Sequence, residues 1–136
     1  MSAGEKVSWL ELVVSVSAMI VVTALYPWLG DGATGAFGLL GLLGFTTVLL
    51  RRRGDRIVVD ERDREIGERG TKFGVLTAWM MLFLTLIGVV LWSASRHQAS
   101  VSVTWLTWLL WVQFALCYAV KGMVGVLSYR GDRHAA

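Results

Sequence analysis

Four long stretches of this chain carry no charged side chain, and they constrain its fold more than any other feature. They run over Leu12–Gly30, Gly32–Leu50, Phe73–Ser95 and Gln98–Val120, with lengths of 19, 19, 23 and 23 residues. A helix needs about 20 mostly apolar residues to cross the hydrocarbon core of a bilayer. We therefore expect four transmembrane spans, at about residues 9–29, 33–50, 73–95 and 101–121, in one membrane domain of residues 1–136.

The charged residues are concentrated between the second and the third stretch. Only 17% of the chain is charged, against about 25% in a typical soluble domain. Of the 13 basic and 10 acidic residues, 14 lie in the connector formed by residues 51–72. The other positions cannot supply the charged surface of a soluble protein. The expected fold is therefore all-α, an integral membrane four-helix bundle made of two transmembrane hairpins.

The distribution of Lys and Arg predicts how these hairpins are oriented. With the connector in the cytosol, 12 of the 13 basic residues lie on the cytosolic side and only Arg96 lies outside. An excess of Lys and Arg is typical of cytosolic loops. We therefore expect both termini in the cytosol. The same bias explains the basic excess of the chain, so no nucleic-acid partner is expected.

The connector itself has a helical pattern from Asp60 onward. Asp60 is suited to cap a helix, and further acidic residues follow in the first turn. Val59, Ile66 and Phe73 recur every seven residues, and no proline lies between Asp60 and the third span. We therefore expect the third helix to begin near Asp60, extend through the cytosol and continue unbroken into the membrane.

The length of the connector suggests that it binds a partner. Its 22 residues exceed the 2–8 or so that join helices in bundles. Asp60, Glu61, Arg62 and Arg69 are the candidate docking residues, and the two arginines would supply charge-assisted contacts. The alternative is a helix end that is merely solvated, since charged helical faces often are.

Among the polar residues in or near the apolar stretches, the candidates for a role in function are Glu11, Gln113 and Lys121. Glu11 and Lys121 are expected near the cytosolic surface, where each side chain either reaches the headgroups separately or pairs with the other. A role in transport is a third possibility. Gln113 lies near the bilayer centre, where its amide should hydrogen-bond to another helix or another subunit.

The second stretch carries a glycine at every third position from residue 32 onward. Small residues allow close approach of membrane helices, so Gly35, Gly38, Gly41 and Gly44 are predicted to pack against a neighbouring helix. On an α-helix with 3.6 residues per turn, this stripe would wind around the axis. A smooth wall for a flat ligand such as a quinone or pigment is the alternative.

The sequence contains no pattern that indicates catalysis. Cys117 is the single cysteine, and the two histidines, His97 and His134, lie outside the expected spans. These counts exclude a disulfide framework and a cysteine-based zinc site. Serine, histidine and acidic residues do not cluster within the membrane stretches as an active site requires. We therefore predict no catalytic, cofactor-binding or metal-binding residue, no cofactor and no enzymatic activity.

The connector also carries a motif with a family resemblance. Val59-Asp60-Glu61-Arg62, then Ile66, Arg69-Gly70 and Thr71, precede an apolar span. This order resembles a family of small four-span prokaryotic membrane proteins of unknown function, which have an Asp-Glu-Arg motif after the second span. The family usually carries alanine where this chain has Gly70. The resemblance implies a multi-pass protein of the prokaryotic cytoplasmic (inner) membrane and implies no activity.

Taken together, these patterns favour a non-enzymatic membrane protein that acts as a subunit, anchor or signalling partner through its connector. Its expected partners are the lipid bilayer and either further copies of itself or a larger membrane complex. A small oligomeric transporter or channel, with Gln113 and Lys121 lining the path, is the first alternative. A binder of a lipophilic cofactor or pigment, built on the glycine-rich stretch and Trp105–Trp111, is the weaker one.

Overall fold

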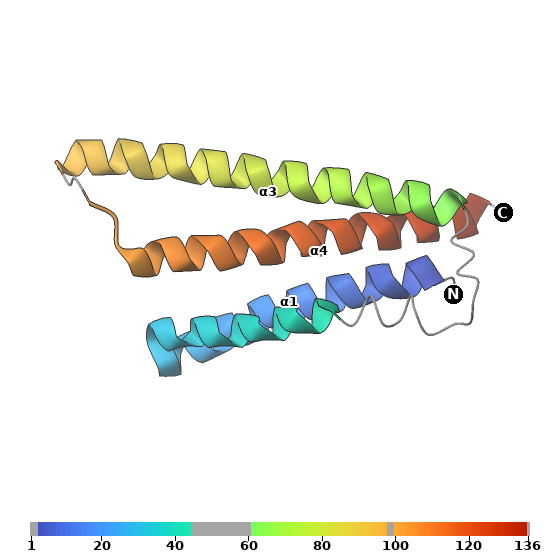
Figure 1. Cartoon of the computed structure of the whole chain (residues 1–136), viewed down its shortest axis with the longest axis horizontal. Coiled ribbons are helices and arrows are strands. Elements are labelled where there is room, and N and C mark those ends of the chain that lie inside the picture. Colours follow the sequence, from blue (N-terminus) through green and yellow to red (C-terminus); the bar gives the residue numbers. More distant parts are fainter. Residues whose placement is uncertain (1–2, 45–60, 98–99, 136) are drawn as a thin grey trace.

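The computed structural model describes residues 3–44, 61–97 and 100–135, and all of its regular elements are helical (Figure 1). They are α1 (Ala3–Leu29), η1 (Gly30–Gly44), α3 (Glu61–Arg96) and α4 (Val103–Ala135). The first and the last two of these are α-helices, whereas η1 is a 3₁₀-helix. The all-α class expected from the sequence is therefore confirmed.

The helices lie side by side in the order α3, α4, α1, η1. α4 packs against α3 on one side and α1 on the other, and η1 folds back along α1 (Figure 1). α1 and α3 make few contacts with each other, so the arrangement resembles a layer more than a closed bundle. α4 is therefore the helix on which the other α-helices assemble.

The expected four-helix bundle is wrong. Among the described residues, three helical segments are long and apolar enough to cross a membrane, and they span Gly4–Gly44, Glu61–Arg96 and Val103–Gly131. The first combines α1 with η1, and the chain reverses between the two at Gly30, which has a φ of 53°. The second expected span, residues 33–50, is thus no separate α-helix. Its residues 45–50 lie outside the described part of the chain.

Glycine spacing gives a physical reason for the 3₁₀ conformation of η1. Each glycine costs an α-helix about 1 kcal/mol relative to alanine, and the η1 sequence has one at every third position. A 3₁₀-helix has 3.0 residues per turn, so this spacing places all the glycines on one side. Phe37, Leu40 and Leu43 then share another side, and all three are buried.

The third helix agrees with the expectation. α3 is one continuous helix of 36 residues that starts in the charged connector and continues through the apolar stretch. It ends at Arg96, where His97 adopts a left-handed φ of 53° and its N–H bonds to the Ala94 carbonyl. A left-handed residue of this kind commonly terminates a helix. The first part of the connector, residues 51–60, lies outside the described residues.

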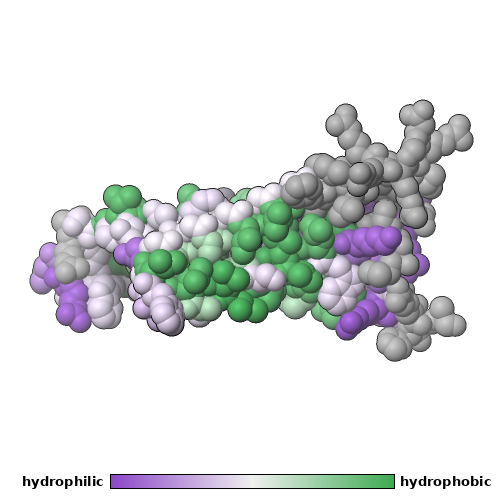
Figure 2. Space-filling model, turned by 90° about the horizontal axis from the view of Figure 1, so that it is seen from below, coloured by the Kyte–Doolittle hydropathy of each residue, from purple (hydrophilic) through white to green (hydrophobic). Residues whose placement is uncertain are grey.

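The exposed surface has the apolar character expected of a membrane protein. Large apolar side chains face outward along α3, among them Phe73, Leu76, Trp79, Met80, Phe83, Leu84, Val90 and Leu91. Figure 2 shows a broad apolar band in the middle of the molecule, with hydrophilic residues gathered at its two ends. Contiguous apolar surface on this scale is typical of a membrane-contacting or partner-contacting face.

The two ends of the molecule differ in the chain segments they contain. Both termini of the described chain lie at the end where α3 begins (Figure 1), and we call this the charged end. The reversal at Gly30 and the connection from α3 to α4 lie toward the opposite end, which we call the hairpin end. Glu11 and Lys121 lie toward the charged end, and Trp105 and Trp108 toward the hairpin end.

Candidate functional site

Glu11 and Lys121 form an ion pair between α1 and α4. The Lys121 Nζ donates to the Glu11 Oε1 at 2.7 Å, and the Glu11 side chain is only 5% exposed. A buried carboxylate is costly unless a charged partner satisfies it. Of the interpretations that the sequence left open, the structure therefore shows pairing.

Close contacts of glycine residues bring the helices together around this pair. A Cβ on Gly122 would lie 2.5 Å from the Leu12 nitrogen of α1. On the other side of α4, a Cβ on Gly74 of α3 would lie 2.6 Å from the Cys117 carbonyl oxygen, and one on Gly70 would lie 3.0 Å from that of Lys121. Only glycine allows the three helix backbones to approach this closely.

The glycines singled out in the sequence lie elsewhere. A Cβ on Gly35, Gly38, Gly41 or Gly44 would meet nothing within 4 Å, so these residues pack against no other described helix of this chain. Their packing against a neighbouring helix outside the described residues stays a prediction. For Gly70 and Gly74 the sequence left a bend or a close contact open, and the structure shows close contacts at both. Their spacing of four is the common small-residue pattern of membrane helix contacts.

Gln113 lies on α4, between the ion pair and the hairpin end. Its side chain is half-buried, and within the described part of the chain its amide has no hydrogen bond. Model helices gain about 1–2 kcal/mol from an interhelical hydrogen bond of such a group. The sequence predicted that this amide bonds to another helix or to another subunit. Since no described helix provides the bond, another subunit stays the predicted partner.

The predicted docking residues lie on the first turns of α3, which we call the α3 extension (residues 61–72). Glu61, Arg62 and Arg69 are exposed there, and Asp60 lies outside the described residues. Arg64 bonds to Glu68 at 2.9 Å between atoms Nε and Oε1, and both side chains are mostly exposed. The extension thus presents acidic and basic groups together on its outer faces.

The inner face of the α3 extension is held against α4. Ile66 and Gly70 are buried, and the Tyr129 hydroxyl of α4 donates to the Asp63 Oδ1 at 2.6 Å. The burial of Ile66 and Gly70 and the Asp63–Tyr129 bond fix the direction of the extension, and the sequence alone did not indicate that bond. Nearer α1, the Arg130 guanidinium of α4 lies 5.3 Å from the centre of the Trp9 ring.

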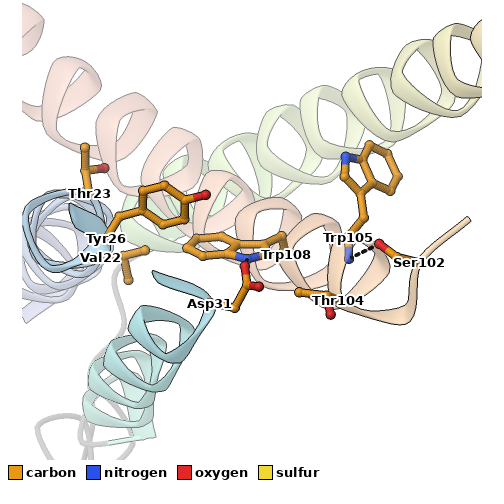
Figure 3. Close-up of a pocket in the computed structure, with 8 residues that line it drawn as sticks. All are labelled: Val22, Thr23, Tyr26, Asp31, Ser102, Thr104, Trp105 and Trp108. Atoms are coloured by element: carbon orange, nitrogen blue, oxygen red, sulfur yellow. Dashed lines mark hydrogen bonds between the residues drawn. The ribbon is translucent and has the colours of Figure 1, made fainter. Parts of the chain in front are cut away.

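At the hairpin end, a cleft with a volume of about 630 Å³ opens between α1, η1 and α4 (Figure 3). The Trp108 indole donates from Nε1 to the Asp31 Oδ1 at 3.1 Å. The Tyr26 ring meets Trp108 edge to face, with centroids 5.6 Å apart. The tryptophans were predicted as packing and interface residues, and nothing in their spacing pointed to Asp31.

The described residues contain no group of three or more His, Cys, Asp or Glu side chains that could hold a metal ion. Neither the ion pair nor the cleft therefore supplies the donor set of a metal centre within that part of the chain. When the chain is compared with protein-family models, with curated proteins and with solved structures, it matches none of them.

Proposed function

We propose that this protein is a non-enzymatic subunit or anchor of a membrane assembly in the prokaryotic cytoplasmic membrane. Its α3 extension would dock a cytosolic or membrane partner, with the extension and both termini on the cytosolic side. The observation that carries the proposal is the fixed geometry of the α3 extension. A charged helix end that is merely solvated has no need of specific contacts on one face.

That geometry depends on contacts of three kinds. Ile66 buries an apolar side chain, Gly70 allows close approach of the Lys121 backbone, and Asp63 accepts the hydrogen bond from Tyr129. These residues occupy the inner face of the extension. The charges on its outer faces are therefore held in a constant position, which lowers the entropic cost of binding a partner.

Arg62 and Arg69 suit such a role because they share one side of the helix. They are seven residues apart, which is two turns, and both are exposed. Arginine forms paired hydrogen bonds with carboxylates. We therefore expect acidic residues on the partner surface that meets this side of α3.

Two further observations support assembly with another subunit. The glycine side of η1 faces no described helix of its own chain, and the Gln113 amide has no described partner. Both are features that a neighbouring membrane helix would satisfy. Transport along a path lined by Gln113 and Lys121 has less support, because the Lys121 ammonium group is already neutralised by Glu11.

Charge reversal of the two arginines tests the proposal. The full chain carrying both Arg62→Glu and Arg69→Glu is expressed in cells, cross-linked, purified in mild detergent and analysed by mass spectrometry. We expect the yield of the partner that cross-links to the wild-type extension to fall at least tenfold. The matched control carries both Arg64→Glu and Lys72→Glu, which changes the net charge equally on other sides of the same helix, and it should retain the partner.

Two outcomes of this experiment would contradict docking at the α3 extension. If the Arg62 and Arg69 variant yields the same cross-linked partners as wild type, the extension is not the docking surface. Equal loss in both variants would also count against it, because binding would then follow net charge and not the position of the arginines. Circular dichroism of each variant verifies that the helices are intact.

A further inference from the structure

The cleft at the hairpin end has a chemical character that the proposed function does not use. Its wall combines aromatic rings with one carboxylate: Trp108 lies in the middle, Tyr26 on one side and Trp105 on the other (Figure 3). A volume of about 630 Å³ falls within the range of about 300–1,000 Å³ found for small-molecule sites. The cleft is therefore large enough for a small organic ligand.

The charge of the cleft favours a cation. Its lining residues include one acidic side chain, Asp31, and no lysine or arginine. The carboxylate uses Oδ1 to accept the bond from Trp108, and no other hydrogen bond to its side chain is found among the described residues. The Asp31 carboxylate thus lies in the cleft, and its described partner, the Trp108 indole, is uncharged.

The backbone of α1 adds to this negative character. Pro27 lies inside the last turns of α1 and has no N–H, so the carbonyl of Thr23, a cleft-lining residue, loses its usual donor four positions on. The C-terminal end of a helix also carries a partial negative charge, and the last turn of α1 contains no basic residue to offset it.

At the opposing helix end, two of the N–H donors already have acceptors within the chain. α4 begins at the other side of the cleft, and the N-terminus of a helix carries a partial positive charge from its free N–H groups. Here the Ser102 side chain accepts a bond from the Trp105 N–H at 3.2 Å, and the Ser102 carbonyl accepts one from the Leu106 N–H at 3.2 Å. These donors are already engaged.

We propose that the cleft binds a small organic monocation of the alkylammonium class. Its charged group lies against the Asp31 carboxylate and the faces of the aromatic rings, and its alkyl groups contact Tyr26, Trp105 and Val22. Aromatic rings attract ammonium ions through the negative face of the ring, and tryptophan does so best. The carboxylate and the rings together recognise both the charge and the apolar surface of such an ion.

A zwitterionic lipid headgroup fits the cleft less well than a free cation. Such a headgroup carries a phosphate next to its ammonium group, and the cleft lining offers no cationic side chain to meet the phosphate. A ligand with a net positive charge has no such mismatch. The proposal therefore commits to a free monocation, and occupation by a lipid becomes an outcome of the test.

Calorimetric titration of the full chain with tetrabutylammonium chloride, in a neutral maltoside detergent, provides the test. We expect saturable binding of one ion per chain. Asp31→Asn should weaken binding at least tenfold, because it removes the charge and keeps the shape. Tyr26→Leu should weaken it independently by removing an aromatic wall, so the result does not depend on one variant folding correctly.

Two control variants make the comparison specific. Glu65→Gln removes an exposed carboxylate at the charged end, and Trp79→Leu removes an exposed aromatic ring of α3 outside the cleft. Both should bind the ion as wild type does. Equal affinity of wild type and Asp31→Asn, or the absence of saturable binding, would overturn the proposal.

Nanodiscs distinguish a free cation from a lipid headgroup. The titration is repeated in discs of phosphatidylglycerol, which has no ammonium group, and in discs that contain phosphatidylethanolamine, which has one. Equal affinity in both supports a site for a free cation. Loss of binding only in the phosphatidylethanolamine discs would show that a headgroup occupies the cleft, and the proposal would then be wrong.

Discussion

Glu11 and Lys121 illustrate how two helices accommodate one charge each at their contact. Each residue alone would expose a buried charge to an apolar surrounding, whereas the bonded pair is neutral as a unit. Removal of one partner leaves the other unpaired, which is strongly destabilising in soluble proteins. The stability of the α1–α4 contact should therefore depend on both residues together.

A double-mutant cycle measures this dependence. We expect Glu11→Gln and Lys121→Gln each to destabilise the protein, and the double variant to cost less than their sum by about 1–3 kcal/mol. The readout is the free energy of unfolding in a denaturing-detergent titration. The same cycle on Arg64 and Glu68, an exposed pair, should give about 0.5 kcal/mol or less. Simple additivity for Glu11 and Lys121 would contradict the pairing.

Among the described glycines of α3, Gly74 makes the closest approach to α4. An added Cβ would lie 2.6 Å from the Cys117 carbonyl oxygen, so Gly74→Ala must push the helices apart and should cost about 1–3 kcal/mol, as overpacking does. Gly88→Ala on the same helix meets nothing within 4 Å and should stabilise by up to about 1 kcal/mol through helix propensity. The unfolding temperature in detergent is measured for both variants. Equal changes in that temperature would contradict the close contact of α3 and α4 at Gly74.

At the scale of elements, η1 shows how helix type decides which residues are buried. With 3.0 residues per turn, positions three apart share a side, so Leu40 and Leu43 are buried against the rest of the chain. Leu39 and Leu42, one position earlier, are 37% and 45% exposed. An α-helix would not maintain this separation over the length of η1.

Matched leucine substitutions test the 3₁₀ conformation. Leu40→Ala should lower the free energy of unfolding by about 2–4 kcal/mol because it leaves a cavity. Leu39→Ala removes the same atoms from an exposed position and should change it far less. Leu43→Ala and Leu42→Ala form a second matched pair with the same expectation. If the two members of each pair destabilise equally, the assigned burial of η1 is incorrect.

The sequence predicted some elements better than others for identifiable reasons. The bounds of α3 follow from a helical charge pattern that meets an apolar stretch without a proline between them. Hydropathy alone gives no helix type, so η1 was expected to be an α-helix with a winding glycine stripe. In the site, Glu11 and Lys121 stood out as charges in apolar surroundings, whereas Asp63–Tyr129 and Asp31–Trp108 join residues 66 and 77 positions apart, which no local pattern reveals.

At the scale of the whole molecule, the layered order of the helices leaves much of the surface apolar. α3 contacts mainly α4, and its remaining sides expose large apolar residues. The hydrophilic residues gather at the two ends (Figure 2), as expected for a molecule that crosses a bilayer. The docking proposal then requires that the charged end, with the α3 extension and both termini, face the cytosol.

Cysteine labelling in intact cells tests that requirement most directly. In a Cys117→Ser background, single cysteines replace Gly32 and Ser100 at the hairpin end, and Glu61 and Gly131 at the charged end. With a membrane-impermeant reagent, positions 32 and 100 should react in intact cells, and positions 61 and 131 only after the membrane is opened. Reaction of position 61 in intact cells would place the α3 extension outside the cytosol and contradict the account.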